Sequence, residues 1–389
     1  MLLSRKLSPT SVFCEVFNKL ALPVLRKVIN FATMINITAF TIGVTTTFFA
    51  VFAIYILFWR KDCSRFQTII GCIMAVWCLW NLKDLVLTFP GMYRDEVLNW
   101  LLIVDGWSAL TYMVLIFEVV IPGWITWSRL LLSAMPFAAF TAAYALWPCQ
   151  MVIYAYVGFL WCFAWGIVIF GYIRMKNKLT YLLDNYSNID KTNVSWLRPV
   201  FFFSILGQLL WLAISFWASP VGDIVYYVMT IVLWLIVLYY SWDFQPIAIT
   251  SEPVETPADD PAAIGETSPS EAKKQLPNGR LETLMEEQKY YLKPTLTLNE
   301  LAQELNTNRT YISSYLNRQM NMTFYDYINK LRIERAAIPL MREHPEYKLE
   351  FVASQSGFAS ISTFRRAFVK VTGQNPSQYA AALAAQEPV

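Results

Sequence analysis

Between Ile37 and Trp242, apolar stretches alternate with short polar connections. Each stretch is about as long as the roughly 20 residues that a helix needs to cross a bilayer. The seven stretches are Ile37–Trp59, Phe66–Val86, Val97–Val119, Leu130–Trp147, Val152–Ile173, Pro199–Ala218 and Ile224–Trp242. This pattern predicts a bundle of seven transmembrane helices. The second stretch is the weakest, because Asn81, Lys83 and Asp84 interrupt its end. A six-helix bundle without it is the alternative.

Composition separates this half of the chain from the rest. Residues Ile37–Trp242 contain eleven Lys and Arg in 206 residues, whereas Gly279–Val389 contains thirteen in 111. The whole chain is 56% hydrophobic and only 15% charged, against roughly 25% charged in ordinary soluble domains. A single soluble globule is excluded, and the fold is expected to be all-α, with a membrane bundle followed by a soluble helical domain.

The basic residues of the connections predict the orientation of the bundle. The connections after the first, third and fifth stretches hold nine of them: Arg60, Lys61, Arg65, Arg129, Arg174, Lys176, Lys178, Lys191 and Arg198. The opposite side holds Arg94 and, at the end of the second stretch, Lys83. Because cytoplasmic loops are enriched in Lys and Arg, we expect a multi-pass protein of the cell inner membrane with everything after Trp242 in the cytoplasm.

Residues 1–33 conflict with this orientation. They carry Arg5, Lys6, Lys19, Arg26 and Lys27, yet seven spans would place them outside. They lack the uninterrupted apolar core of a signal peptide. A start at Met34, directly before the first stretch, would remove the conflict, and an amphipathic surface helix is the alternative. Residues 34–244 are the expected membrane domain.

Ionisable residues inside spans are costly and therefore functional candidates. Lys83, Asp84 and Glu118 lie close enough to the ends of their stretches to reach an interface. Asp105 lies deeper in the third stretch, so it should be neutral, paired or facing a water-filled cavity. We identify Asp105 as the sensor candidate for an unknown signal ligand, with Lys83 and Arg94 as the nearest partners by sequence.

Residues 245–277 are rich in Pro and acidic residues and poor in large apolar ones. Such a segment cannot bury enough surface to fold, so it should be a flexible linker of about 30 residues. The six cysteines all precede it, no pair has the spacing of a zinc site, and His344 is the only histidine. We expect no metal, no cofactor and no disulfide framework. The sequence has no phosphate-binding loop and no nucleophile–base pair, so an enzyme is not expected.

An internal repeat marks residues 278–389. The first copy has Leu298, Ala302, Asn306, Ile312 and Leu316, and the second has Leu349, Ala353, Gly357, Phe364 and Phe368. The spacing is that of a helix-turn-helix. A small residue lets two helices approach closely, and four residues later the turn needs a positive φ, which Gly357 adopts freely and Asn306 next best. The two apolar anchors of the second helix then face inward.

These residues carry a resemblance. Leu298–Thr323 and Leu349–Tyr379 resemble the two DNA-binding subdomains of the AraC/XylS transcription regulators. The matching motifs are Ser356–Phe358, Ser362–Phe368, Thr372–Tyr379, Asn308–Ser313 and Tyr327–Ile333. The resemblance implies seven helices that bind two adjacent major-groove segments of double-stranded DNA. The whole chain also resembles, less specifically, a variant of this family with a multi-span N-terminal domain.

The resemblance also implies, by position, which residues contact DNA. In the first helix-turn-helix they are Arg309, Thr310, Ser313 and Ser314, and in the second they are Ser362, Arg365 and Arg366. Arg pairs with guanine in a bidentate way, and Ser and Thr contact base edges or phosphates. Pro339 falls where the family's linking helix continues, so an early end of that helix is expected. Ala380 replaces an Arg frequent in the family.

Together these patterns predict a membrane-anchored one-component transcription regulator. The membrane domain would sense a signal, and the cytoplasmic domain would bind DNA, with a homodimer gaining effective concentration for paired sites. The soluble part carries a net charge of only +2, so non-specific DNA affinity should be modest. A transporter or channel-like protein with a regulatory DNA-binding domain is the alternative. Inverted repeats between the two halves of the bundle would favour it.

Overall fold

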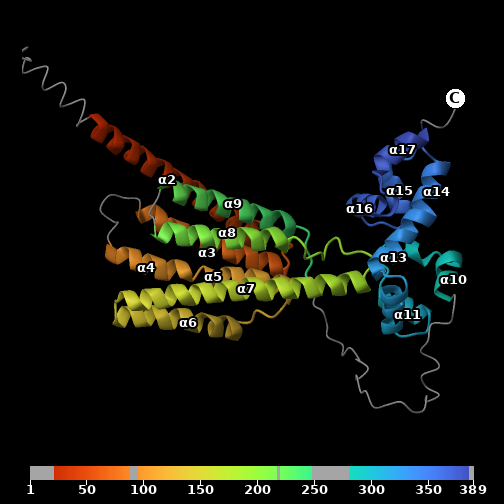
Figure 1. Cartoon of the computed structure of the whole chain (residues 1–389), viewed down its shortest axis with the longest axis horizontal. Helices are drawn as coiled ribbons and strands as arrows, with labels where there is room; N and C mark the ends of the chain where they lie inside the picture. Colours follow the sequence, from red (N-terminus) through yellow and green to blue (C-terminus); the bar gives the residue numbers. More distant parts are fainter. Residues whose placement is uncertain (1–21, 88–94, 217–219, 248–279, 385–389) are drawn as a thin grey trace, which may run out of the picture. The chain divides into compact units, whose positions relative to one another are not determined.

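In a computed structural model of the chain, residues 22–87, 95–216, 220–247 and 280–384 are described (Figure 1). The regular elements of these residues are all helices, and one isolated β-bridge joins Tyr186 to Thr297. The chain divides into two compact units. Met1–Tyr172 and Trp196–Pro246 form the N-terminal unit, and Ile173–Ser195 and Ile247–Val389 form the C-terminal unit. The prediction of an all-α fold is confirmed.

The N-terminal unit is a helical bundle. Its helices are α2 (Leu22–Ile54), which continues as η2 (Tyr55–Trp59), α3 (Arg65–Leu87), α4 (Asp95–Gly106), α5 (Ala109–Val120), α6 (Trp127–Leu146), the first part of α7 (Gln150–Asn185), α8 (Leu197–Phe216) and α9 (Pro220–Ser241). Within the described residues, seven helical stretches are long and apolar enough to cross a membrane, with α4 and α5 together forming the third. The predicted seven-helix bundle is confirmed over the predicted six-helix alternative.

Three helices differ from the predicted stretches. The helix α2 begins at Leu22, before the predicted start at Ile37, although its apolar span begins at Ile37. The third stretch is interrupted after Gly106, where the amide of Ser108 donates to the carbonyl of Asp105 at 3.0 Å. The predicted end of the fifth stretch was Ile173, but α7 continues to Asn185. Hydropathy falls at Ile173 because Arg174, Lys176 and Lys178 follow. Loss of hydropathy marks the end of the apolar surface, whereas the helical backbone continues beyond it.

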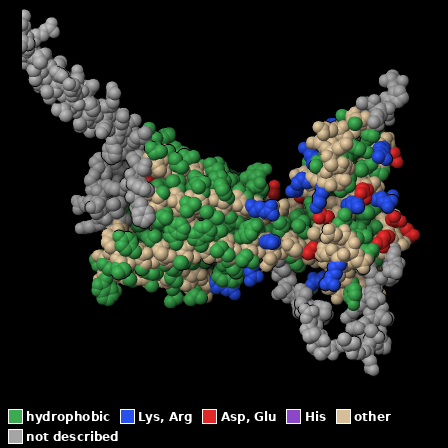
Figure 2. Space-filling model, viewed as in Figure 1, with side chains coloured by type: hydrophobic (Ala, Val, Ile, Leu, Met, Phe, Trp, Pro, Cys, Tyr) green, Lys and Arg blue, Asp and Glu red, His purple; other side chains and the backbone are tan. Residues whose placement is uncertain are grey.

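Aromatic residues form the centre of the bundle, and apolar residues also cover its outside. Phe49 on α2, Trp77 on α3 and Trp234 on α9 are buried, and their ring centroids lie 5.6 to 6.1 Å apart. The visible outer face of the bundle is largely hydrophobic (Figure 2), and Phe58 is 83% exposed and Met151 75% exposed. A protein in water rarely exposes so large an apolar surface, so this exterior suits a lipid environment.

The C-terminal unit contains two small cores joined by one long helix. Its helices are the end of α7, then α10 (Arg280–Glu287), η4 (Tyr290–Leu292), α11 (Leu298–Glu304), α12 (Arg309–Ser314) with η5 (Tyr315–Gln319), α13 (Phe324–Leu331) with η6 (Arg332–Ala337) and α14 (Ile338–Glu343), α15 (Leu349–Gln355), α16 (Ile361–Thr372) and α17 (Pro376–Ala384). The first core ends along the chain at Ile328, and the second begins at Ile333. The two subdomains therefore meet within α13 and η6.

The expectation that Pro339 ends the linking helix early was wrong. The backbone is helical without a gap from Phe324 to Glu343. A π-helical segment, η6, precedes Pro339 and places it in the first turn of α14. Proline is tolerated there, because an N–H in the first turn needs no partner within that helix.

Several predicted segments lie outside the described residues. These include residues 1–21 of the N-terminal segment, Arg94, and residues 248–279 of the expected linker. Their predicted roles are therefore not described by the structure.

Candidate DNA-binding site

The first helix-turn-helix consists of α11 and α12, and each helix begins at a polar cap. Thr297 and Glu300 form a reciprocal capping box at the start of α11. Asn308 accepts a hydrogen bond from the amide of Thr310 at the start of α12. Asn306, in the turn between the helices, has a φ of 53°. The prediction of a left-handed turn residue at this position is confirmed.

The second helix-turn-helix repeats this arrangement with α15 and α16. Gly357 has a φ of 82° in the turn, as predicted. A Cβ at this position would lie 2.6 Å from the carbonyl oxygen of Leu292, so both the dihedral angle and the close approach require glycine. Ser360 caps α16 by accepting from the amide of Thr363 at 3.2 Å. The predicted anchors Phe364 and Phe368 are fully buried.

The predicted DNA-contacting residues lie on the outer sides of α12 and α16. These two helices, the second of each helix-turn-helix, are called the reading helices below. Thr310, Ser362, Arg365 and Arg366 are exposed, and Arg309, Ser313 and Ser314 are partly exposed. The structure does not bring these seven residues together in one cluster, because four of them lie on α12 and three lie on α16. Arg365 lies 4.0 Å from Glu350 of α15, which is a weak surface ion pair.

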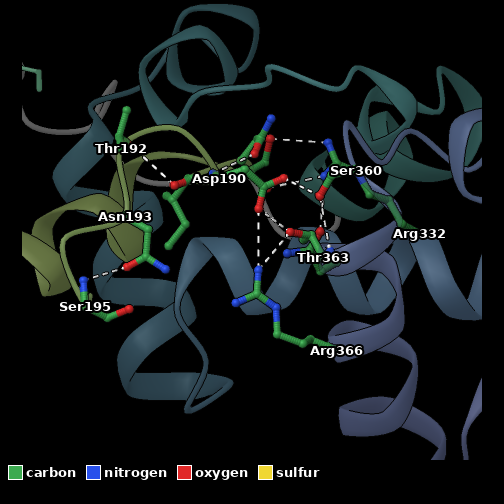
Figure 3. A network of polar contacts seen from close by, with 12 residues as sticks. Asp190, Thr192, Asn193, Ser195, Arg332, Ser360, Thr363 and Arg366 are labelled. Atoms are coloured by element: carbon green, nitrogen blue, oxygen red, sulfur yellow. Dashed lines mark hydrogen bonds and ion pairs between the residues drawn. The ribbon is translucent and has the colours of Figure 1, made fainter. Parts of the chain in front are cut away.

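A carboxylate from the segment after α7 contacts the start of the second reading helix (Figure 3). Asp190 accepts hydrogen bonds from the hydroxyl of Ser360, at 2.6 Å, and from the hydroxyl of Thr363. Arg366 lies 3.5 Å from the same carboxylate and donates to Thr363 at 3.1 Å. The side chain of Asp190 is 22% exposed, and that of Arg366 is 59% exposed. The predicted residue Arg366 is therefore already engaged by an acidic residue of this chain.

A buried arginine connects the two subdomains. Arg332 is 1% exposed and donates to the carbonyls of Tyr291 and Lys293, each at 2.7 Å. It also donates to the carbonyl and the hydroxyl of Ser187, at 3.3 and 3.2 Å. Its guanidinium carbon lies 5.5 Å from the ring centre of Phe358 in the second subdomain. Burial lowers the pKa of Arg332 to about 10, so the group stays charged at neutral pH.

Sequence reasoning missed Asp190, Ser187, Thr363 and Arg332. Only Arg332 could have been recognised from the sequence. It follows Ile328 by four residues and so falls on the apolar side of the linking helix. A charged residue at such a position indicates a specific buried partner. The contacts of Asp190 join residues 170 to 176 positions apart in the sequence, and no local pattern predicts such contacts.

A second polar cluster lies inside the N-terminal unit, around the sensor candidate. Lys83 Nζ lies 2.8 Å from an oxygen of Asp105 and also contacts Asp84. The hydroxyl of Tyr227 on α9 donates to Asp84 at 2.9 Å. The structure therefore brings Asp105 together with Lys83, one of its two predicted neighbours, and places both in a network that joins α3, α4 and α9.

The helix end that carries Asp105 also contacts α7. Tyr156 donates from its hydroxyl to the carbonyl of Ile103 at 2.9 Å and is fully buried. A Cβ at Gly106 would overlap this hydroxyl, so only glycine fits there without a shift of Tyr156. Glu118, which was expected to reach the interface, has a buried side chain 3.1 Å from Arg65.

Comparison with known proteins agrees with the geometry of the C-terminal unit. Residues 301–382 match the family model described as Helix-turn-helix domain. Over 85 residues, 22% of this chain, the sequence is 27% identical to the Msm operon regulatory protein of Streptococcus mutans, and the match covers 30% of that protein. Over 84 residues, also 22% of this chain, it is 30% identical to an uncharacterized HTH-type transcriptional regulator of Staphylococcus aureus (strain COL), covering 11% of it.

These matches span less than a third of the length of either relative. No solved structure matches the chain. The matched residues include α12 and α16 with all seven predicted DNA-contacting residues. The C-terminal part of this chain is therefore similar to the helix-turn-helix domains of transcription regulators.

Proposed function

We propose that this protein is a membrane-anchored one-component transcription regulator that binds specific duplex DNA. The observation that carries the proposal is the pair of helix-turn-helix units whose second helices, α12 and α16, expose Arg, Ser and Thr over buried apolar anchors. A helix of this kind reads base edges when it lies in a major groove. The linking helix joins the two helix-turn-helix units, so α12 and α16 could bind two adjacent segments of the major groove.

Membrane anchoring is supported by the apolar exterior of the N-terminal unit and by the seven apolar helical stretches. The asymmetry of Lys and Arg supports a cytoplasmic C-terminal unit, which could then reach DNA. The protein is then a multi-pass protein of the inner membrane. A homodimer on one membrane would present two such domains to paired DNA sites.

Signal sensing is proposed for the cluster around Asp105. Charged groups inside a membrane bundle are retained where they serve a pathway, a relay or a ligand. Tyr156 connects the end of α4 to α7, and α7 belongs to both units, because its residues from Ile173 onward pack in the C-terminal unit. A rearrangement at Asp105 can therefore reach the C-terminal unit along a single helix.

Arg366→Ala should weaken binding to specific DNA by about 1–3 kcal/mol, the range for one good base contact. Its side chain points away from the buried Phe364 and Phe368, so the fold should be unchanged. The measurement uses the full chain in lipid nanodiscs. Duplexes are first selected from a random pool with the parent protein, and the affinity of both forms for the selected duplex is then compared at fixed salt.

Arg335→Ala is the matched control for this experiment. Arg335 lies on the linking helix, and its side chain is 59% exposed, as is that of Arg366. Its removal takes away the same charge without altering a reading helix. Equal losses in the two variants would contradict base or phosphate contact by α16, and failure of the parent to enrich any duplex would contradict DNA binding itself.

The membrane orientation gives a separate prediction. A cytoplasm-active reporter fused after Trp242 should be active, and one fused after Pro148 should be inactive, because nine basic connection residues lie on the first side. Enzyme activity at equal fusion abundance is the measurement. The reverse pattern would contradict both the orientation and access of the C-terminal unit to DNA.

A further inference from the structure

The segment that ends α7 and follows it contacts both helix-turn-helix subdomains within the C-terminal unit. We define it as the 184–190 segment. Tyr186 forms a β-bridge with Thr297 at the start of α11, and the amide of Ser187 donates to the carbonyl of Leu296 at 3.0 Å. Asn317 of η5, the segment directly after α12, lies close enough to Asp184 to favour its charged form.

The far end of this segment contacts the second reading helix. Asp190 engages the cap residue Ser360, the first-turn residue Thr363 and the exposed Arg366. The segment therefore places one carboxylate, Asp190, on α16 and another, Asp184, beside η5 at the end of α12. Between them, Ser187 accepts two hydrogen bonds from Arg332, where the two subdomains meet.

The groups that hold Asp190 are the kinds of group that bind a DNA phosphate. Hydroxyls and an arginine gather there at the amino end of α16, whose partial positive charge favours an anion. Phosphate contacts of this sort set the position of a reading helix on the duplex. A carboxylate and a phosphate cannot occupy the same donors together, and their like charges repel.

We propose that the 184–190 segment is an intramolecular competitor of DNA, and that Asp190 occupies a phosphate-binding position at the start of α16. The inference rests on the proposed function, since it requires α16 to meet DNA. In the docked form α16 is blocked, and release of the segment frees Ser360, Thr363 and Arg366 together. Because the segment continues directly from α7, the membrane unit can control its release.

The docked and released forms of the 184–190 segment are two states in equilibrium. Hydrogen bonds to a charged group are stronger than neutral ones, so the contacts of Asp190 favour the docked form that the structure describes. When only a fraction of the molecules can bind, the apparent affinity is reduced by that fraction. Weakening the docked form should therefore tighten DNA binding, although no new contact to DNA is made.

The test compares the parent, Asp190→Asn and Asp190→Ala as full chains in nanodiscs of phosphatidylethanolamine and phosphatidylglycerol. The probe is the duplex that the parent selects from a random pool, supplemented by the duplex that Asp190→Asn selects. We expect both variants to lower the Kd by about tenfold, since the docked form then no longer competes. In the parent, hydrogen exchange at residues 186–190 should become faster when DNA is added.

Glu343→Gln is the matched control, because it removes one exposed negative charge from the same unit without touching either reading helix. Its Kd should stay within about twofold of the parent, as expected for a screened surface charge. Thermal melting of each form checks that the fold is retained. A gain in Glu343→Gln equal to that in Asp190→Asn would overturn the competition and assign the effect to net charge.

The remaining outcomes separate this inference from the proposed function. If the parent binds DNA and the Asp190 variants bind equally or more weakly, the contact belongs to the DNA-binding form and the inference is overturned. If the protection of residues 186–190 is unchanged by bound DNA, it is overturned as well. Failure of every form to enrich a duplex would overturn both proposals.

Discussion

Arg332→Ala should lower the free energy of unfolding of the C-terminal unit by about 3 kcal/mol, because it leaves buried acceptors without donors. The carbonyls of Tyr291 and Lys293 each lose a 2.7 Å hydrogen bond, and Ser187 loses two. The arginine is 1% exposed, so its hydrogen bonds form in an interior shielded from water. The loss should spread to both subdomains, since Arg332 contacts residues of each.

Hydrogen exchange of peptides from α13 and α16 in the full chain measures this effect directly. The C-terminal unit contains no tryptophan after Gly279, so intrinsic fluorescence would report mainly on the N-terminal unit. Arg335→Ala, one turn away and exposed, should change the stability by no more than about 0.5 kcal/mol. An Arg332→Ala protein with the protection of the parent would contradict a structural role for the buried arginine.

The parts of the fold that the sequence predicted are those determined by local patterns. A spanning helix requires an apolar run of bilayer length, so the starts and ends of six of the seven stretches lie close to the predicted ones. A tight turn between two close helices requires a positive φ, so Asn306 and Gly357 could be recognised from their spacing. Amphipathic spacing likewise predicted the buried anchors of α12 and α16.

The parts that the sequence did not predict depend on contacts between distant residues. Pro339 was expected to end a helix, but a π-helical segment precedes it and places it in the first turn of α14, where proline is tolerated. The end of α7 was placed at Ile173, because basic residues lower hydropathy without breaking a helix. Asp190 was not identified at all, since its role depends on α16, which lies 170 residues away and folds as part of a separate repeat.

Asp105→Asn should abolish the transcriptional response of the full-length protein or make it constitutive. Asparagine retains the shape of the side chain and removes its charge. Lys83 is then left with Asp84 alone, which itself accepts a hydrogen bond from Tyr227. If the balance of Lys83 between the two carboxylates distinguishes two states of the bundle, only one state remains, and the ratio of the response with and without signal falls to about one.

Three measurements are needed to assign such a loss to Asp105. Membrane abundance of Asp105→Asn should be near that of the parent, because the substitution replaces a charge by a polar group of equal size. Binding of its full chain in nanodiscs to the selected duplex should remain, because the reading helices belong to the other unit. The response itself is followed with a reporter gene behind that duplex, across growth conditions in which the parent responds.

Asp84→Asn provides the matched control, because it removes the same charge from the same network but leaves the 2.8 Å pair of Lys83 and Asp105 in place. A response lost in Asp105→Asn and retained in Asp84→Asn would locate the sensing role at α4, whose end contacts α7 through Tyr156. Loss in both variants would assign the role to the network as a whole. An Asp105→Asn protein that responds like the parent at equal abundance would show that this cluster only holds the bundle together. The signal would then have to reach the 184–190 segment without it.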